Sequence, residues 1–387
     1  MSVVHPFCAL RPAPERAATV SSVPYDVVNT GEARQLAAGN PLSFLHVTRS
    51  EIDLPAETDP YSPAVYQKAR DNFVALRARA PMLLEEEPSV YFYRLRMGGH
   101  EQTGLAACFS LDEYDRGLIK KHERTRRDKE DDRTRHMIEL RAQTGVVFLT
   151  YNAVDEIDRL CRAVTADAPL YDFRADDGVQ HTLWRVRPKE ATGVVDVFAN
   201  VPAMYIADGH HRAASAARAR AELGRREGPG EADTFIAVAF PDNQAQILPY
   251  NRIVKDLAGM TAEQFLAALR VRVSVREGSA APSGKGEVAM YLEGRWYAID
   301  LSGAAPADSS RARALDVALL QQHVLEPLLK IGDVRTDRRI DFVGGARGTA
   351  ALEKAVERGD AAVAFAMCPV TMDDLMSIAD EGGIMPP

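Results

Sequence analysis

The sequence predicts an α+β protein in which strands and helices interleave without a regular repeat. Three observations indicate this class. The chain has 387 residues, of which 46% are hydrophobic and 26% are charged, as is ordinary for a globular protein. Apolar runs of strand length alternate with segments that have helical spacing. The length exceeds what a single compact core usually needs, so two or three packed units are expected.

The N-terminal region, residues 1–111, is expected to contain α+β structure. The segment SSVPYDVV, residues 21–28, predicts a strand or a turn, because the residue before Pro24 is displaced from the helical region. Residues 61–80 carry apolar side chains at helical spacing and predict a helix. Residues 88–111 form two strand-like runs around a Gly-Gly pair, which is typical of a β-hairpin.

The central region, residues 112–240, begins with the most charged part of the chain. The second half of residues 112–145 predicts a helix with a solvated face. Two apolar runs, residues 146–152 and 181–187, predict strands, and GRREGPGEAD, residues 224–233, predicts a loop.

The C-terminal region, residues 241–387, alternates strands and helices again. Helices are expected over residues 261–270 and 314–329, and strands over 286–301 and 361–370. No motif assigns this region a task. It is expected either to close over a site or to pair with a second copy of the chain in a homodimer.

Charge and cysteine content exclude several classes of protein. The formal net charge is −8, so the chain is not expected to bind nucleic acid through a general basic surface. Cys8, Cys108, Cys161 and Cys368 lie far apart without a C-x-x-C pair, which favours reduced, mostly buried thiols and a cytoplasmic protein. The sequence shows neither a signal peptide nor a run of about 18 apolar residues, so no membrane span is expected.

The segment YIADGHHRAASAARAR joins the end of an apolar strand, a polar turn and an alanine-rich helix. Gly209 permits a tight turn, and Asp208 is a natural N-cap for the helix. The amides of a helix start attract anions, and Arg212 adds a bidentate grip on a phosphate oxygen. His210 and His211 supply donors or acceptors and titrate near neutral pH. The turn is therefore predicted to bind phosphate.

Two other interpretations of this turn stay open. It is either a capped helix whose histidines are structural, or a metal site made by the two histidines. The second is awkward, because adjacent residues on a helix point about 100° apart.

A second polar cluster, GLIKKHERT, lies upstream and contains His122 and Glu123. A glutamate beside a histidine and several cations is a candidate general base. The alternative is that residues 120–135 form only a charged, solvated face.

Together the two clusters resemble the domain-of-unknown-function family 1015. The shared pattern is H-E-x-T, a strand, and Y-I-A-D-G-H-H-R, with PYDV at residues 24–27 and D-D-G-V-x-H-x-L-W at 176–184 in the same order. That family is similar to the ParB/sulfiredoxin superfamily. The resemblance implies a ParB/sulfiredoxin-like mixed core over residues 112–240, with additional N-terminal and C-terminal α/β elements.

The family is also similar to the free-serine kinases, which carry a comparable D-G-H-H-R turn and a P-H-E segment whose glutamate is the catalytic base. The resemblance implies that Glu123 takes the proton of the serine hydroxyl, with His122 beside it and His211 also catalytic. It implies that the turn from Asp208 to Arg212 binds the phosphates of a nucleotide. Lys121 stands where a proline is usual.

The resulting hypothesis is a phosphotransfer enzyme of serine biosynthesis. It would act as a serine kinase with ADP or ATP as donor, or in the phosphatase direction on O-phosphoserine. Mg²⁺ is expected, held by Asp208 or by a carboxylate of KEDDR, residues 129–133. The sequence has no G-x-x-x-x-G-K-[ST] loop.

The alternative from another class is a ParB-like nucleotide-binding regulator or DNA-binding module without catalysis. It would need a basic docking surface from the arginines of residues 124–135 and 212–226. The acidic residues interleaved with the first group weaken such a surface.

Overall fold

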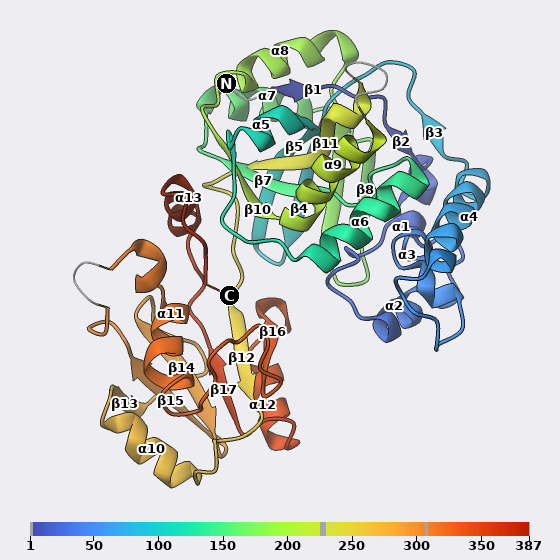
Figure 1. The fold of residues 1–387 in the computed structure, drawn as a ribbon. Helices are drawn as coiled ribbons and strands as arrows, with labels where there is room; N and C mark the ends of the chain where they lie inside the picture. Colours follow the sequence, from blue (N-terminus) through green and yellow to red (C-terminus); the bar gives the residue numbers. More distant parts are fainter. Residues whose placement is uncertain (1–2, 225–229, 306–308, 387) are drawn as a thin grey trace. The chain divides into compact units, whose positions relative to one another are not determined.

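The computed structural model describes residues 3–224, 230–305 and 309–386. The chain divides into two compact units, Met1–Ala245 and Gln246–Pro387 (Figure 1). Each unit has its own β-sheet and hydrophobic core, and helices and strands are mixed in both, which confirms the predicted α+β class. The ParB/sulfiredoxin-like core stays a prediction.

A nine-stranded sheet forms the centre of the first unit. Its strands are β1 (Val4–His5), β4 (Tyr91–Met97), β5 (His100–Ser110), β6 (Ile119–Lys120), β7 (Val147–Tyr151), β8 (Tyr171–Arg174), β9 (Gln180–Arg185), β10 (Met204–Asp208) and β11 (Thr234–Pro241). Their order is β6-β10-β7-β11-β5-β4-β9-β8, with β1 beside β5. Strands from both sides of residue 111 therefore share one sheet. The hairpin expected over residues 88–111 is confirmed as the antiparallel pair β4–β5.

The core of the first unit lies on one face of this sheet. Alternate residues of each strand point into it, as Leu105, Ala107 and Phe109 of β5 do, because side chains of a strand alternate between faces. Helices α7 (Asp155–Thr165), α8 (Pro188–Phe198) and α9 (His210–Leu223) contribute to the same core. Four alanines of α9 are buried, and their small side chains let the helix lie close to its neighbours; they are Ala213, Ala214, Ala216 and Ala219.

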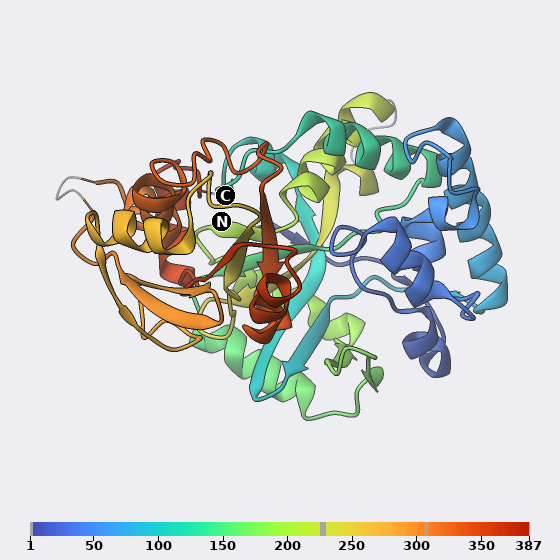
Figure 2. The same ribbon diagram turned by 90° about the horizontal axis from the view of Figure 1, so that it is seen from below.

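Helix α6 (Arg127–Leu140) lies beside α9 and connects it to the N-terminal helices (Figure 1). The remaining helices of the first unit are α1 (Ala17–Val20), α2 (Thr30–Ala37), α3 (Leu45–Thr48), α4 (Pro63–Arg79) and α5 (Leu111–Asp115). Helices α1 to α4, drawn in blue, form one group (Figure 2). Tyr66 of α4 donates a hydrogen bond of 2.8 Å to the buried Asp132 of α6, and the ring of His136 lies 3.0 Å from the Val47 carbonyl.

The second unit contains a six-stranded sheet with helices packed on it. Its order is β13 (Ser274–Glu277), β15 (Arg295–Asp300), β14 (Glu287–Leu292), β17 (Val363–Ala366), β12 (Tyr250–Val254) and β16 (Ile340–Gly344). The helices are α10 (Ala262–Arg270), α11 (Asp316–Leu320), α12 (Ala350–Glu357) and α13 (Met372–Asp380). A two-stranded sheet, β2 (Leu10–Arg11) with β3 (Leu83–Leu84), belongs to the first unit.

Several local expectations can be compared with the structure. Residues 21–28 form a turn, and the helix expected over 61–80 is α4. Of the loop expected over 224–233, residues 225–229 lie outside the described residues. Among the described residues, no helix is long and apolar enough to cross a membrane. The four cysteines are free thiols and each is partly buried; Cys108, for example, alternates with the core-facing residues of β5.

Gly104 of β5 provides a test of this packing. A Cβ at this position would lie 2.6 Å from the Ala239 carbonyl oxygen and 2.8 Å from the Phe240 ring. We expect Gly104→Ala to lower the free energy of unfolding of the first unit by about 1–3 kcal/mol, the usual cost of overpacking.

Gly99→Ala is the control, because a Cβ there meets nothing within 4 Å. Urea unfolding would be followed by the fluorescence of Trp184 in a Trp296→Phe background, since the chain has 2 tryptophans and this leaves one, in the first unit. Similar losses in both glycine variants would contradict the packing described for β5.

Candidate functional site

Two short parallel strands bring the polar clusters together. Strand β6 pairs with β10 in parallel, with Ile119 opposite Met204 and Lys120 opposite Tyr205. The segment that contains Glu123 follows the carboxyl end of β6, and the turn before α9 follows the carboxyl end of β10. Because parallel strands end at the same edge of a sheet, both polar segments meet there.

The turn at the start of α9 depends on Gly209. This residue has φ 91° and ψ 28°, in the left-handed region that favours glycine. A Cβ would lie 3.2 Å from Nη1 of Arg212 and 3.3 Å from the Cα of Val147. Gly209 is itself the N-cap, so the expectation that Asp208 caps the helix is wrong. The chain reverses one residue later than expected, and Asp208 still belongs to β10.

Arg212 bonds to protein groups on two sides. Its side chain is 6% exposed, and Nη2 donates to both carboxylate oxygens of Asp26, at 2.6 and 2.8 Å. Nη1 donates to the Val146 carbonyl at 2.7 Å and lies 3.1 Å from the carboxylate of Asp208. The phosphate grip expected of Arg212 stays a prediction. A phosphate would have to share the guanidinium with Asp26 or displace it.

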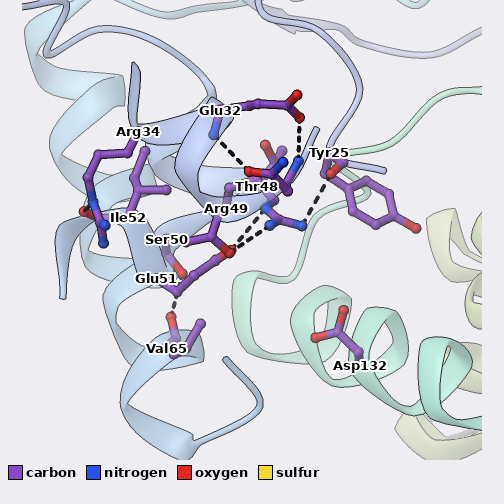
Figure 3. Close-up of polar contacts among 12 residues, drawn as sticks. Tyr25, Glu32, Arg34, Thr48, Arg49, Ser50, Glu51, Ile52, Val65 and Asp132 are labelled. Carbon is purple, nitrogen blue, oxygen red and sulfur yellow. Dashed lines mark hydrogen bonds and ion pairs between the residues drawn. The ribbon is translucent and has the colours of Figure 1, made fainter. Parts of the chain in front are cut away.

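Asp26 and Tyr25 are site residues to which sequence reasoning gave no role. Both lie in the PYDV segment, so that motif was the available signal. The Tyr25 ring lies 4.3 Å from the guanidinium of Arg133 and 5.8 Å from that of Arg212. Burial raises the pKa of Tyr25 to about 12. Arg49 is hydrogen-bonded to this turn, because its Nη1 donates to the Tyr25 carbonyl at 3.4 Å (Figure 3).

The two adjacent histidines bind the backbone of the upstream segment. Nε2 of His210 accepts a hydrogen bond from the His122 amide at 3.4 Å, and Nε2 of His211 accepts one from the Arg126 amide at 3.0 Å. An accepting Nε2 places the proton of each neutral ring on Nδ1. The two rings thus point to different amides, which is not the arrangement of a shared metal site.

The histidine rings are held in their neutral form. The rings of His122 and His210 lie edge to face, with centroids 4.4 Å apart. Burial lowers the pKa of His122 to about 4. Burial also lowers the pKa of His210 to about 3, and His122, His211 and Lys121 add to this shift. The pKa of His211 is lowered by burial as well.

Glu123 lies between the two bonded amides of His122 and Arg126, and its carboxylate is exposed. The side chain is 53% exposed, and Oε2 lies 3.4 Å from Nδ1 of His210. Burial of part of the side chain raises the pKa of Glu123, and the nearby Asp208 carboxylate raises it further. Lys121 points away, with its amine 3.6 Å from the ring centre of Tyr114. A carboxylate with a raised pKa that still contacts solvent suits a general base.

The acidic residues of KEDDR are engaged elsewhere. Glu130 and Asp131 form ion pairs with Arg218, at 3.3 and 2.5 Å, and Asp132 pairs with Arg133 at 2.7 Å. No group of three or more His, Cys, Asp or Glu side chains suited to a metal occurs in the part of the chain that the structure describes. The most exposed carboxylates beside the turn are those of Glu123 and of Asp208, the second of which also lies 3.1 Å from Arg212.

The family described as "Protein of unknown function (DUF1015)" matches residues 4–318. No curated protein matches the chain. The solved structures that match over 73% of it include a conserved hypothetical protein from Pyrococcus furiosus, with 13% identity, a TM-score of 0.35 and 88% of that chain covered. SbnI with C-terminal truncation from Staphylococcus aureus has 11% identity, a TM-score of 0.39 and 79% covered. A free serine kinase in complex with AMP has 12% identity and a TM-score of 0.36, with 84% of that chain covered. These TM-scores are too low to support a functional argument.

The contacts of Arg212 predict that lysine cannot replace it. A lysine amine cannot bond to Asp26 and to the Val146 carbonyl with the same forked geometry. We expect Arg212→Lys to lower the free energy of unfolding of the first unit by about 2 kcal/mol. Arg218→Lys on the same helix is the control, because Arg218 is 34% exposed and its pairs are worth less than about 1 kcal/mol. Equal losses of stability in the two variants would argue against the buried contacts of Arg212 with Asp26 and with the Val146 carbonyl.

The histidine pKa values predict a loss of stability in acid. The ordinary value is 6.5, and the folded values are about 4 for His122 and about 3 for His210. Between these limits the unfolded chain binds more protons, so the stabilisation is present above pH 6.5 and is lost as the pH falls toward the folded values.

We therefore expect the melting temperature to fall from about pH 7 to about pH 4, and to fall less steeply in His210→Gln than in the wild type. The exposed His5→Gln, in β1, is the control and should follow the wild type. If all three proteins show the same slope, the neutral ring of His210 is not a source of stability.

Proposed function

The chain belongs to the family described as a protein of unknown function, DUF1015, and from this premise we propose that it is a phosphotransfer enzyme acting on free serine or O-phosphoserine. One observation carries the proposal. The carboxylate of Glu123, its pKa raised by burial and by Asp208, faces solvent beside the start of α9. This places a candidate base next to a candidate phosphate site, as phosphoryl transfer requires.

In the kinase direction, the serine hydroxyl oxygen attacks the terminal phosphorus of ADP or ATP. The new oxygen–phosphorus bond forms while the bond to the bridging oxygen breaks, and its electron pair leaves with AMP or ADP. Glu123 accepts the hydroxyl proton and later releases it to water. In the phosphatase direction, Glu123 takes a proton from water as the water oxygen attacks the phosphorus of O-phosphoserine. The bond to the serine oxygen breaks, Glu123 returns the proton to that oxygen, and serine and inorganic phosphate are released. The kinase reaction run backward would instead transfer the phosphate to AMP or ADP, and a site that stabilises one transition state serves both directions of that transfer.

The phosphates would lie at the start of α9, from Asp208 to Arg212. The first amides of a helix have no partner within it, and they carry partial positive charge. Arg212 lies beside the turn, and a phosphate there would bond to its guanidinium only by sharing it with Asp26 and Asp208 or by displacing one of them.

Mg²⁺ would be held by Asp208. Mg²⁺ usually takes one or two carboxylates together with substrate phosphates and waters, and the exposed carboxylate of Asp208 fits that pattern. When bound, the ion would neutralise part of the charge on the phosphates.

The charges of α6 and α9 favour an enzyme over a DNA-binding module. Arg126 pairs with Asp128 at 2.8 Å, and Arg220 pairs with Asp112 and Asp115 at 2.7 and 2.5 Å. Arginines that face acidic partners offer little attraction to a phosphate backbone. A cytoplasmic location and a homodimer stay predictions from the sequence.

The first experiment incubates the protein with Mg²⁺, L-serine and either ADP or ATP. A second mixture contains O-phosphoserine with or without AMP, and phosphoserine, nucleotide and free phosphate are followed in both. Formation of phosphoserine or of serine supports the proposal and gives its direction. If folded protein is silent in every mixture, the proposal fails for these substrates and the nucleotide-binding regulator gains weight.

Glu123→Gln tests the base. Glutamine keeps the shape of the side chain but cannot accept the proton, so we expect kcat to fall by about 10²–10⁴-fold while nucleotide binding persists. Glu156→Gln, on the exposed face of α7, is the control and should leave the rate unchanged. A near wild-type rate in Glu123→Gln would exclude Glu123 as the base.

A further inference from the structure

We propose that His210 and His211 are positioning residues, which hold Glu123 in place by bonding to the backbone on both sides of it. The catalytic consequence rests on the phosphotransfer function proposed above. The placement itself rests only on the contacts of the described residues.

The two histidines bracket Glu123 along the chain. His210 accepts from the amide of His122, which directly precedes Glu123, at 3.4 Å. His211 accepts from the amide of Arg126, three residues after it, at 3.0 Å. Two neighbouring side chains at the start of one helix therefore fix both ends of a short segment, and the carboxylate between them stays exposed.

The same contacts limit what the histidines can do in the reaction. Because Nε2 of each ring accepts an amide hydrogen, Nε2 has no lone pair left to take a proton from a substrate. Nδ1 of His210 carries the remaining hydrogen and faces Oε2 of Glu123 at 3.4 Å. No hydrogen bond joins these two atoms, so His210 acts on the backbone of the segment, and the proton chemistry falls to Glu123.

Hydrogen exchange at single amides tests the placement without reference to any activity. We expect His210→Leu to speed exchange of the His122 amide about tenfold, the scale of one hydrogen bond, and to change the Arg126 amide less. His211→Leu should show the reverse pattern. Glutamine can present an oxygen acceptor near the place of Nε2, so His210→Gln and His211→Gln should restore protection.

Unchanged exchange in both leucine variants, or equal acceleration across the whole first unit, would overturn the placement. The kinetic readout uses the same variants in the serine assay. We expect kcat to fall about tenfold or more in the leucine variants with KM for the nucleotide unchanged, and to recover in the glutamine variants. Selective exchange with an unchanged kcat would overturn the role in catalysis. A wild-type protein without phosphotransfer would refute the proposed function, and the exchange pattern would still decide the placement.

Discussion

The parallel pairing of β6 with β10 is the constraint on which the site depends. The pair is only two residues long on the β6 side, yet it places the Glu123 segment and the Gly209 turn at the same edge of the sheet. The segments after the two strands are also joined by hydrogen bonds from the amides of His122 and Arg126 to the rings of His210 and His211.

Arg212 also joins segments of the chain near that edge of the sheet. Its guanidinium connects the N-terminal turn, through Asp26, to the loop before β7, through Val146. A buried charge with partners on three segments is costly to disturb, since removing one partner leaves the charge uncompensated. The sequence predicts that Arg212 binds phosphate, whereas in the structure its guanidinium bonds to the surrounding chain. Phosphate binding and these chain contacts would use the same nitrogen atoms.

Features that depend on local pattern could be predicted from the sequence. The β4–β5 hairpin and α4 follow from a Gly-Gly turn and from helical spacing, which a short window contains. The expected cap at Asp208 failed because the chain reverses at Gly209, and the choice between two adjacent turn residues depends on packing against Val147. The partner of Arg212 could not be inferred either, since no local pattern connects Asp26 to a helix so far along the chain.

The ion pair between Asp26 and Arg212 also has a consequence for how the chain folds as it is synthesised. The two residues are separated by 186 positions, so the ribosome must deliver most of the first unit before this contact can close. Until then the N-terminal turn lacks its buried partner, and the sheet lacks the strand that places the turn before α9. Contacts of such long sequence separation slow folding and prolong the exposure of unpaired edges. The contact of the N-terminal turn therefore has to wait for Arg212, although Asp26 belongs to the first part of the chain to be made.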